Sequence, residues 1–140
     1  MDIHGAYTEV LIRWMERLAN GDSLIIHGDG TQTMDFVYVE DVARANVLAA
    51  QSDVVDEVFN IGSGVETSLN ELAQAFCHAM GSRVRVQYGP ERKVNGVTRR
   101  LADVRRAHTL MGFQSRIALD EGIQRLVHWW KGQQISVGAA

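Results

Sequence analysis

The tightest constraint on the fold is the stretch from Gly28 to Ala45, GDGTQTMDFVYVEDVARA, in which a turn, a strand-like run and a helix follow one another without a linker. The Asp-Gly pair at 29–30 is typical of a turn, and DFVYV has the β-branched and aromatic composition of a strand. Glu40 and Asp41 then place negative charge in the first turn of a helix at 40–51. The preceding SLIIHG also predicts a strand, which we expect to lie near DFVYV. This alternation predicts a mixed α/β fold.

Apolar residues at helical spacing predict further helices. One spans residues 8–20, carries a broad apolar stripe and ends at NGD. Another begins after Ser68, which precedes Glu71 by the three residues of a capping box, and Gly81 ends it. Between these helices EVFNIGSG predicts a strand that ends in a glycine loop, and RVRVQY after Gly81 alternates like a half-exposed strand.

The C-terminal part of the chain predicts two more helices. Asp103 is placed to cap a short helix at 104–111, and Gly112 suits the left-handed position after its end. A last amphipathic helix carries its apolar stripe on Ile123, Leu126, Val127 and Trp130. We therefore expect an α/β (α+β) fold, one small mixed domain of about five helices and four or five short strands at 1–132. Residues 133–140 show no periodicity and predict a frayed tail.

Length and composition exclude several classes of protein. The chain has 140 residues, of which 46% are hydrophobic, as expected for one globular domain with a modest core. No apolar run reaches the roughly 20 residues that cross a bilayer, and MDIHGAYTEV lacks the features of a signal peptide, so we expect a cytoplasmic protein without a membrane partner. The single Cys77 sits at helical spacing and is interpreted as a small buried residue.

Positive charge is concentrated in one segment. The net charge is −3, but residues 83–106 carry eight basic and two acidic side chains. A local basic block in an acidic chain favours a small anionic ligand over a nucleic acid, which usually needs a broad basic face and stacking aromatics. The alternative is that these arginines are merely solvated. The basic residues are Arg83, Arg85, Arg92, Lys93, Arg99, Arg100, Arg105 and Arg106.

No motif in the chain names a reaction. GDGTQT and IGSGVETSLNEL do not have the glycine spacing of a dinucleotide loop or of a phosphate loop that ends in Gly-Lys-Ser/Thr, so turns explain them better. The five histidines are scattered and there is no cysteine pair, so no metal site is expected. Ser63 lacks the glycine two residues before it that a hydrolase elbow requires. We therefore expect no catalytic residue in this chain.

Four stretches together resemble the C-terminal half of extended short-chain dehydrogenase/reductases, the NAD-dependent nucleotide-sugar epimerases and dehydratases, with UDP-glucose 4-epimerase-like proteins as the closest group. They are GDGTQTMDFVYVEDVARA, VFNIGSGVETSLNELA, RRLADVRRAHTLMGF and ALDEGIQRLVHWW. The resemblance covers nearly the whole chain. It implies that Gly28–Ala45 is scaffold and wall of a nucleotide site, and not a dinucleotide loop.

The resemblance also implies a set of nucleotide-sugar-binding residues. It places Ile26 and His27 near the base of the nucleotide. Family members usually have a diphosphate-binding arginine where Met34 stands, and Met34 cannot provide that contact. The family often has R-x-G-D where this chain has Lys93 to Gly96, so a bidentate cation and a ribose-binding carboxylate are both replaced. The candidate cations to replace these contacts are Arg92, Arg99 and Arg100.

The family's catalytic motifs are missing from these 140 residues. There is no G-x-x-G-x-x-G loop for NAD, and no tyrosine is followed four residues later by lysine. We therefore expect that the chain alone binds no cofactor, although the family uses NAD. Three hypotheses remain: the substrate-binding portion of an epimerase or dehydratase that is inactive alone, a stand-alone nucleotide-sugar-binding module, and a structural subunit that completes a Rossmann-domain partner in trans.

Self-association is a further expectation. In the resembled enzymes this lobe packs against a Rossmann domain, so a chain without that partner would expose apolar surface and form a homo-oligomer. Trp14, Trp129 and Trp130 are candidates for that surface. The alternative is that the tryptophans fill the core of the lobe itself.

Overall fold

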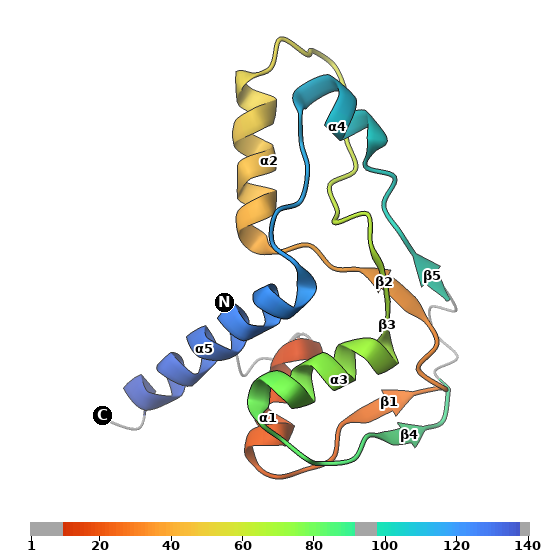
Figure 1. The fold of residues 1–140 in the computed structure, drawn as a ribbon, viewed down its shortest axis with the longest axis vertical. Coiled ribbons are helices and arrows are strands. Elements are labelled where there is room, and N and C mark those ends of the chain that lie inside the picture. The colour runs from red at the N-terminus through yellow and green to blue at the C-terminus, as the bar shows by residue number, and fades with distance from the viewer. Residues whose placement is uncertain (1–9, 92–97, 138–140) are drawn as a thin grey trace.

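A computed structural model describes residues 10–91 and 98–137, which form five helices and five short strands (Figure 1). The mixed α/β architecture expected from the sequence is confirmed. The helices are α1 (Val10–Ala19), α2 (Val39–Gln51), α3 (Leu69–Met80), α4 (Arg105–Met111) and α5 (Leu119–Val137). The strands are β1 (Ile25–His27), β2 (Thr33–Asp35), β3 (Glu66–Ser68), β4 (Gln87–Gly89) and β5 (Arg99–Arg100).

The strands form two small sheets. In the first, β1 pairs with β4 in parallel, so that Ile26 lies opposite Tyr88. In the second, β2 lies in the middle, antiparallel to β3 and parallel to β5. The two strands that we expected to lie near each other around the turn at Asp29–Gly30 are β1 and β2, and they belong to different sheets and do not pair. The second strand also ends at Asp35, since neither β3 nor β5 continues far enough to pair with residues 36–39.

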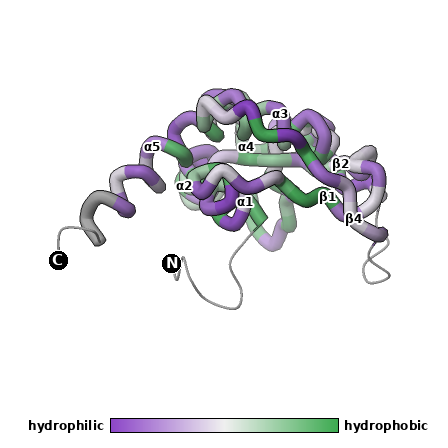
Figure 2. Tube along the Cα trace, turned by 90° about the horizontal axis from the view of Figure 1, so that it is seen from below, coloured by the Kyte–Doolittle hydropathy of each residue, from purple (hydrophilic) through white to green (hydrophobic). Residues whose placement is uncertain are grey.

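Two groups of buried side chains divide the described residues into two lobes, whose helices and strands can be followed in Figure 1. The large lobe consists of α1, α3, α5, β1 and β4, and its core includes Trp14 packed edge-on against Phe76, with ring centroids 6.1 Å apart. Trp14 and Trp130 are both buried in this core, so the expectation that they lie on an exposed apolar face is wrong. The small lobe consists of α2, α4 and the segments 53–64 and 112–118, and its buried cluster is Ala45, Ala107, Met111 and Phe113. Helix α5 projects away from the body toward the C-terminus (Figure 2).

Several helix ends lie where the local sequence predicted them. Ser68 and Glu71 form the expected capping box, and Gly81 ends α3 in the left-handed conformation with φ of 67°. At the start of α4 the cap position is occupied by Val104 instead of Asp103, although the Asp103 carboxylate still accepts a hydrogen bond from the Arg105 backbone N–H. Helix α5 continues to Val137 and so includes part of the tail at 133–140, while the domain boundary at 132 stays a prediction.

The segment EVFNIGSG is not a strand, which corrects the sequence prediction. Residues 57–61 form no ladder with any strand in the described parts of the chain. The nearest strand, β3, lies further along at Glu66–Ser68. A strand needs a neighbour for its backbone hydrogen bonds, and the amino-acid pattern alone does not supply one.

Candidate functional site

The sheet of β2, β3 and β5 brings together three of the residues expected to bind nucleotide sugar. Met34 lies opposite Thr67 on one side and opposite Arg100 on the other. Residues that pair across a ladder point to the same face of the sheet, so Arg100 and Met34 are side-by-side neighbours. Arg100 is exposed and makes no ion pair with another residue that the structure describes. A cation from β5 thus lies beside the position where β2 carries an uncharged side chain.

Arg99 lies on the opposite face and its charge is already compensated. Its Nε donates to both carboxylate oxygens of Glu66, at 2.9 and 3.0 Å, and Thr33 Oγ1 donates to the same carboxylate at 2.5 Å. Hydrogen bonds from Arg99 and then Thr33 lower the pKa of Glu66, and the carboxylate in turn raises the pKa of Arg99. Of the two neighbouring arginines, Arg100 is therefore the one that remains available to an anion.

Strands β1 and β2 each contact a described residue of the basic segment 83–106. The His27 ring nitrogen Nδ1 lies 3.2 Å from the Pro90 carbonyl oxygen, and the Thr33 N–H donates to the Thr98 carbonyl at 2.9 Å. Ile26 is buried in the core of the large lobe, so its side chain is not available to a ligand. The expected contacts Arg92, Lys93 and Gly96 lie outside the described residues.

The turn after β1 is built from internal hydrogen bonds. The Asp29 carboxylate accepts from the Thr31 N–H at 2.9 Å and from its hydroxyl at 2.7 Å, and these bonds lower the pKa of Asp29. Gly30 has a φ of 76°, and a Cβ there would meet the Asn70 side chain at 2.2 Å. Asn70 in turn donates to the Asp29 carbonyl and accepts from Tyr88 Oη. This close packing accounts for the glycine without a bound phosphate.

The Asp35 carboxylate binds the backbone N–H groups of the second glycine-rich loop, Gly62–Gly64. Asp35 accepts hydrogen bonds from the N–H and hydroxyl of Ser63, at 2.7 and 2.5 Å, and from the N–H groups of Gly64 and Ala102, at 3.0 and 3.3 Å. A Cβ on Gly62 would lie 2.4 Å from the Asp35 carboxylate. The sequence pattern alone indicated no role for Asp35. Asp35 is the last residue of β2, and its partners in the Gly-Ser-Gly loop and at Ala102 are 28 to 67 residues away, so no local pattern signals the contact.

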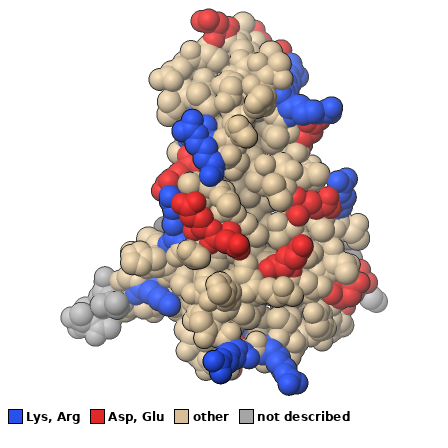
Figure 3. Space-filling model, viewed as in Figure 1, with Lys and Arg blue, Asp and Glu red and all other residues tan. Residues whose placement is uncertain are grey.

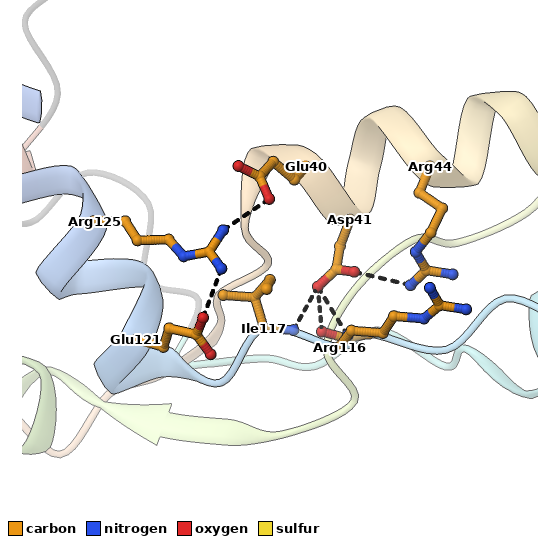
Figure 4. Close-up of polar contacts among 8 residues, drawn as sticks. Glu40, Asp41, Arg44, Arg116, Ile117, Glu121 and Arg125 are labelled. Atoms are coloured by element: carbon orange, nitrogen blue, oxygen red, sulfur yellow. Dashed lines mark hydrogen bonds and ion pairs between the residues drawn. The ribbon is translucent and has the colours of Figure 1, made fainter.

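Asp41 joins α2 to the segment between α4 and α5 (Figure 4). Its side chain is only 2% exposed and accepts from Arg44, from the Ser115 hydroxyl and from the N–H groups of Arg116 and Ile117, all at 2.8 to 3.0 Å. Burial alone would raise the pKa of Asp41, but Arg44 and the three other donors outweigh burial and lower it to about 2. The sequence pattern indicated only a helix-dipole role for Asp41, because its other partners are distant in the chain.

Next to Asp41, a second set of contacts links α2 with α5 (Figure 4). Arg125 donates to Glu40 at 2.8 Å and to Glu121 at 2.6 Å, and its guanidinium lies 5.5 Å from the centre of the Tyr38 ring. Both clusters therefore fix the N-terminus of α2. The Asp41 cluster lies within the small lobe, where it joins α2 to the segment 112–118, and the Arg125 cluster holds α2 against α5 of the large lobe.

Other chemistry expected from the sequence can be checked against the described residues. Within residues 10–91 and 98–137 no three His, Cys, Asp or Glu side chains cluster in a way that could hold a metal ion. Burial raises the pKa of the partly buried Cys77 thiol. In the same residues no helix is long and apolar enough to span a membrane.

The chain is similar to a family of known proteins. Residues 2–62 match the model of the NAD dependent epimerase/dehydratase family. A putative UDP-glucose 4-epimerase of Methanocaldococcus jannaschii is 42% identical over 87% of the chain and 39% of the relative. The UDP-glucose 4-epimerase of Mycolicibacterium smegmatis is 36% identical over 94% of the chain and 42% of the relative.

Solved structures extend the match. The UDP-glucose 4-epimerase of Thermotoga maritima, solved with UDP-glucose, superposes with a TM-score of 0.86 at 33% identity, over 95% of this chain and 42% of its own. The chain belongs to the NAD-dependent epimerase/dehydratase family. A UDP-N-acetylglucosamine 4-epimerase of Methanobrevibacter ruminantium, solved with UDP-N-acetylmuramic acid, is another relative in this epimerase family, with a TM-score of 0.85 at 30% identity.

The matched part is a portion of the family's fold. The chain spans about two fifths of the length of the curated epimerase/dehydratase relatives, 39% and 42% for the two above. The resemblance stated from the four sequence stretches is thereby confirmed. Some relatives in the family were solved with NAD, among them MoeE5 in complex with UDP-glucuronic acid and NAD, which is 35% identical and covers 89% of this chain.

Proposed function

We propose that this chain is the nucleotide-sugar-binding portion of an NAD-dependent epimerase or dehydratase, and that it neither binds NAD nor turns over substrate alone. The observation that carries the proposal is the β2–β5 register, which sets Arg100 beside Met34. Arg100 offers a diphosphate the cation that Met34 does not, while Arg99 is held by Glu66. The ligands named for the relatives, UDP-glucose and UDP-N-acetylmuramic acid, support a UDP-sugar as the ligand class.

The proposed site combines two groups of residues. His27 lies on β1 and Arg100 on β5, and the basic residues Arg92 and Lys93 belong to the connection between β4 and β5. Arg99 is also on β5, but its charge is paired with Glu66. We expect binding to be weak, because only part of the family's fold surrounds the site. We also expect binding to be salt-sensitive, since ions screen exposed cations.

Calorimetric titration with UDP-glucose tests the site. Arg100→Ala should weaken binding about tenfold, which corresponds to about 1.4 kcal/mol. Arg105→Ala is the matched control, because Arg105 is also an exposed arginine but pairs with Asp103 at 2.6 Å. Equal affinities for the wild type and Arg100→Ala would contradict the role of Arg100. An unchanged affinity in the double variant Arg92→Ala, Lys93→Ala would show that these two cations do not contribute to UDP-glucose binding.

Titration with NAD tests the second half of the proposal. The groups by which the family binds and uses the cofactor are absent from the 140 residues, so we expect no binding tighter than about 100 μM, roughly −5.5 kcal/mol. A tighter dissociation constant, or epimerase turnover by the chain alone, would refute it.

A further inference from the structure

Asp35 lies where three segments of the chain meet. It ends β2, and its carboxylate accepts hydrogen bonds from the loop at 62–64 and from the segment that follows β5. Its oxygen Oδ1 accepts from the N–H and the hydroxyl of Ser63. Its oxygen Oδ2 accepts from the N–H groups of Gly64 and Ala102. These four donors are all neutral, and they belong to two segments that are distant from β2 in the sequence.

The packing around this carboxylate is close. A Cβ added at Gly62 would lie 2.4 Å from Oδ2 of Asp35 and 2.7 Å from Cβ of Ala102. Both distances are well inside the roughly 3.5 Å at which carbon atoms make contact, so only glycine fits at position 62. The end of β2, the glycine-rich loop and the segment after β5 therefore pack directly on one another at Asp35.

This junction lies two residues after Arg100. Strand β5 is only two residues long, so few ladder hydrogen bonds hold it to β2. Before the strand, the Thr33 N–H donates to the Thr98 carbonyl at 2.9 Å. After the strand, the Ala102 N–H donates to Asp35 at 3.3 Å. Because Arg100 lies between these two attachments, the Asp35 contact fixes the C-terminal end of the short backbone segment that carries the Arg100 side chain.

Asp35 and Arg100 lie on opposite faces of the sheet. Side chains alternate along a strand, so Asp35 lies on the face opposite Met34 and opposite Arg100, the cross-strand neighbour of Met34. The carboxylate is therefore not a contact for an anion that Arg100 binds, and its own charge would repel that anion. Any benefit from Asp35 comes through the position of Arg100.

The charge distribution makes that position important. Figure 3 shows basic and acidic side chains interspersed over one face of the molecule, without a broad basic patch on that face. The net charge is −3, so the field of the whole chain does not attract an anion. A diphosphate therefore gains from binding where an individual cation is held in the right place.

We propose that Asp35 is a positioning residue of the nucleotide-sugar site. Its carboxylate binds the glycine-rich loop and the segment after β5 to the end of β2, and it thereby holds Arg100 beside Met34, where the guanidinium binds the diphosphate. This inference rests on the proposed function, because it assigns to Asp35 the placement of the cation that the proposed function uses.

Calorimetric titration of the 140-residue chain with UDP-glucose tests this role in the wild type, Asp35→Asn, Arg100→Ala and the double variant. Asp35→Asn keeps the size of the side chain but replaces one acceptor oxygen by an NH₂ group. We expect it to weaken binding about fivefold, with no further loss when it is added to Arg100→Ala, because Asp35 acts through Arg100. The direction is informative, since removing a negative charge near the site would by itself strengthen the binding of an anion.

Asp41→Asn is the matched control. Asp41 is also a carboxylate with four donors, but it lies in the small lobe. At a temperature at which circular dichroism shows all variants folded, Asp41→Asn should leave the affinity for UDP-glucose unchanged. The role of Asp35 is overturned by an unchanged or higher affinity in Asp35→Asn, by an equal loss of affinity in Asp41→Asn, or by a further fivefold loss when Asp35→Asn is added to Arg100→Ala.

Ser63→Ala is the second variant and decides the question if Asp35→Asn does not fold. It removes only the hydroxyl donor to Oδ1, so we expect binding to weaken about twofold, and again only when Arg100 is present. An affinity equal to that of the wild type would then refute the proposal. If Arg100→Ala weakens binding and the Asp35 and Ser63 variants do not, the proposed function stands without a role for Asp35. If Arg100→Ala binds like the wild type, the role of Arg100 fails and the role of Asp35 fails with it.

Discussion

The two lobes bury their apolar residues in different ways. Among the residues that the structure describes, α1, α3 and α5 of the large lobe enclose a core of twelve buried side chains, while the small lobe has a cluster of four and leaves several valines exposed. The helices of the two lobes also differ in how their N-termini are stabilised. Helix α3 has a capping box, whereas no side chain caps α2, and Asp41 fixes α2 through partners 74 to 76 residues away. The large lobe thus has a closed core and local helix caps, whereas the position of α2 in the small lobe depends on contacts with residues distant in the sequence.

The largest expected effect comes from the core of the large lobe. Phe76 is fully buried, so Phe76→Ala should lower the free energy of unfolding by about 3–5 kcal/mol. Val47→Ala on the exposed face of α2, where Val47 is 53% exposed, should change it by less than about 0.5 kcal/mol. Urea denaturation followed by circular dichroism measures both. Similar losses in the two variants would contradict the distinction between a closed core and an uncovered face.

Asp41 should give the next largest effect. Asp41→Asn removes the negative charge from a buried site with four donors, and we expect a loss of about 2–3 kcal/mol in the free energy of unfolding. Asp103→Asn is the control, because Asp103 is exposed, and it should change stability little. If the two variants lose the same stability, the small lobe does not depend on Asp41.

The same carboxylate predicts a dependence on pH. The pKa of Asp41 is about 2 in the folded protein and 3.8 in an ordinary carboxyl group of this type. Its stabilising contribution is therefore complete above about pH 4 and is lost as the pH falls toward 2. The midpoint of thermal unfolding should fall more steeply over this range in the wild type than in Asp41→Asn. Parallel curves for the two proteins would contradict the assignment.

The smallest effect should come from the helix cap of the large lobe. Ser68→Ala removes the hydroxyl that accepts the Glu71 N–H at 3.2 Å, and we expect a loss of about 1 kcal/mol. Ser52→Ala, at the C-terminal end of α2, is the control, because the Ser52 hydroxyl only donates to the exposed Ala49 carbonyl. A larger loss from Ser52→Ala would mean that local capping matters more in the small lobe.

Features that depend on residues close together in the sequence were predicted, and features that depend on distant residues were not. The Ser68 cap and the glycines that end α3 and α4 depend on residues within one helical turn, and they were predicted correctly. The roles of Asp35 and Asp41 depend on donors 28 to 76 residues away, and no local pattern reveals them. The segment 57–61 shows a third case, because its pattern is that of a strand but strand formation depends on a neighbour. Likewise Arg100 became a sharper candidate than Arg99 only through the β2–β5 register.

The carboxylate of Asp35 has a consequence for how the molecule responds to its solvent. It is tethered beside the amides of Ser63 and Gly64, so its effective concentration there exceeds that of any free anion in ordinary buffers. Dissolved phosphate or sulfate therefore competes poorly for this loop. The chain carries its own tethered carboxylate at one glycine-rich turn, and this leaves the exposed Arg100 of the neighbouring β5 as a place where a soluble anion can gain from binding.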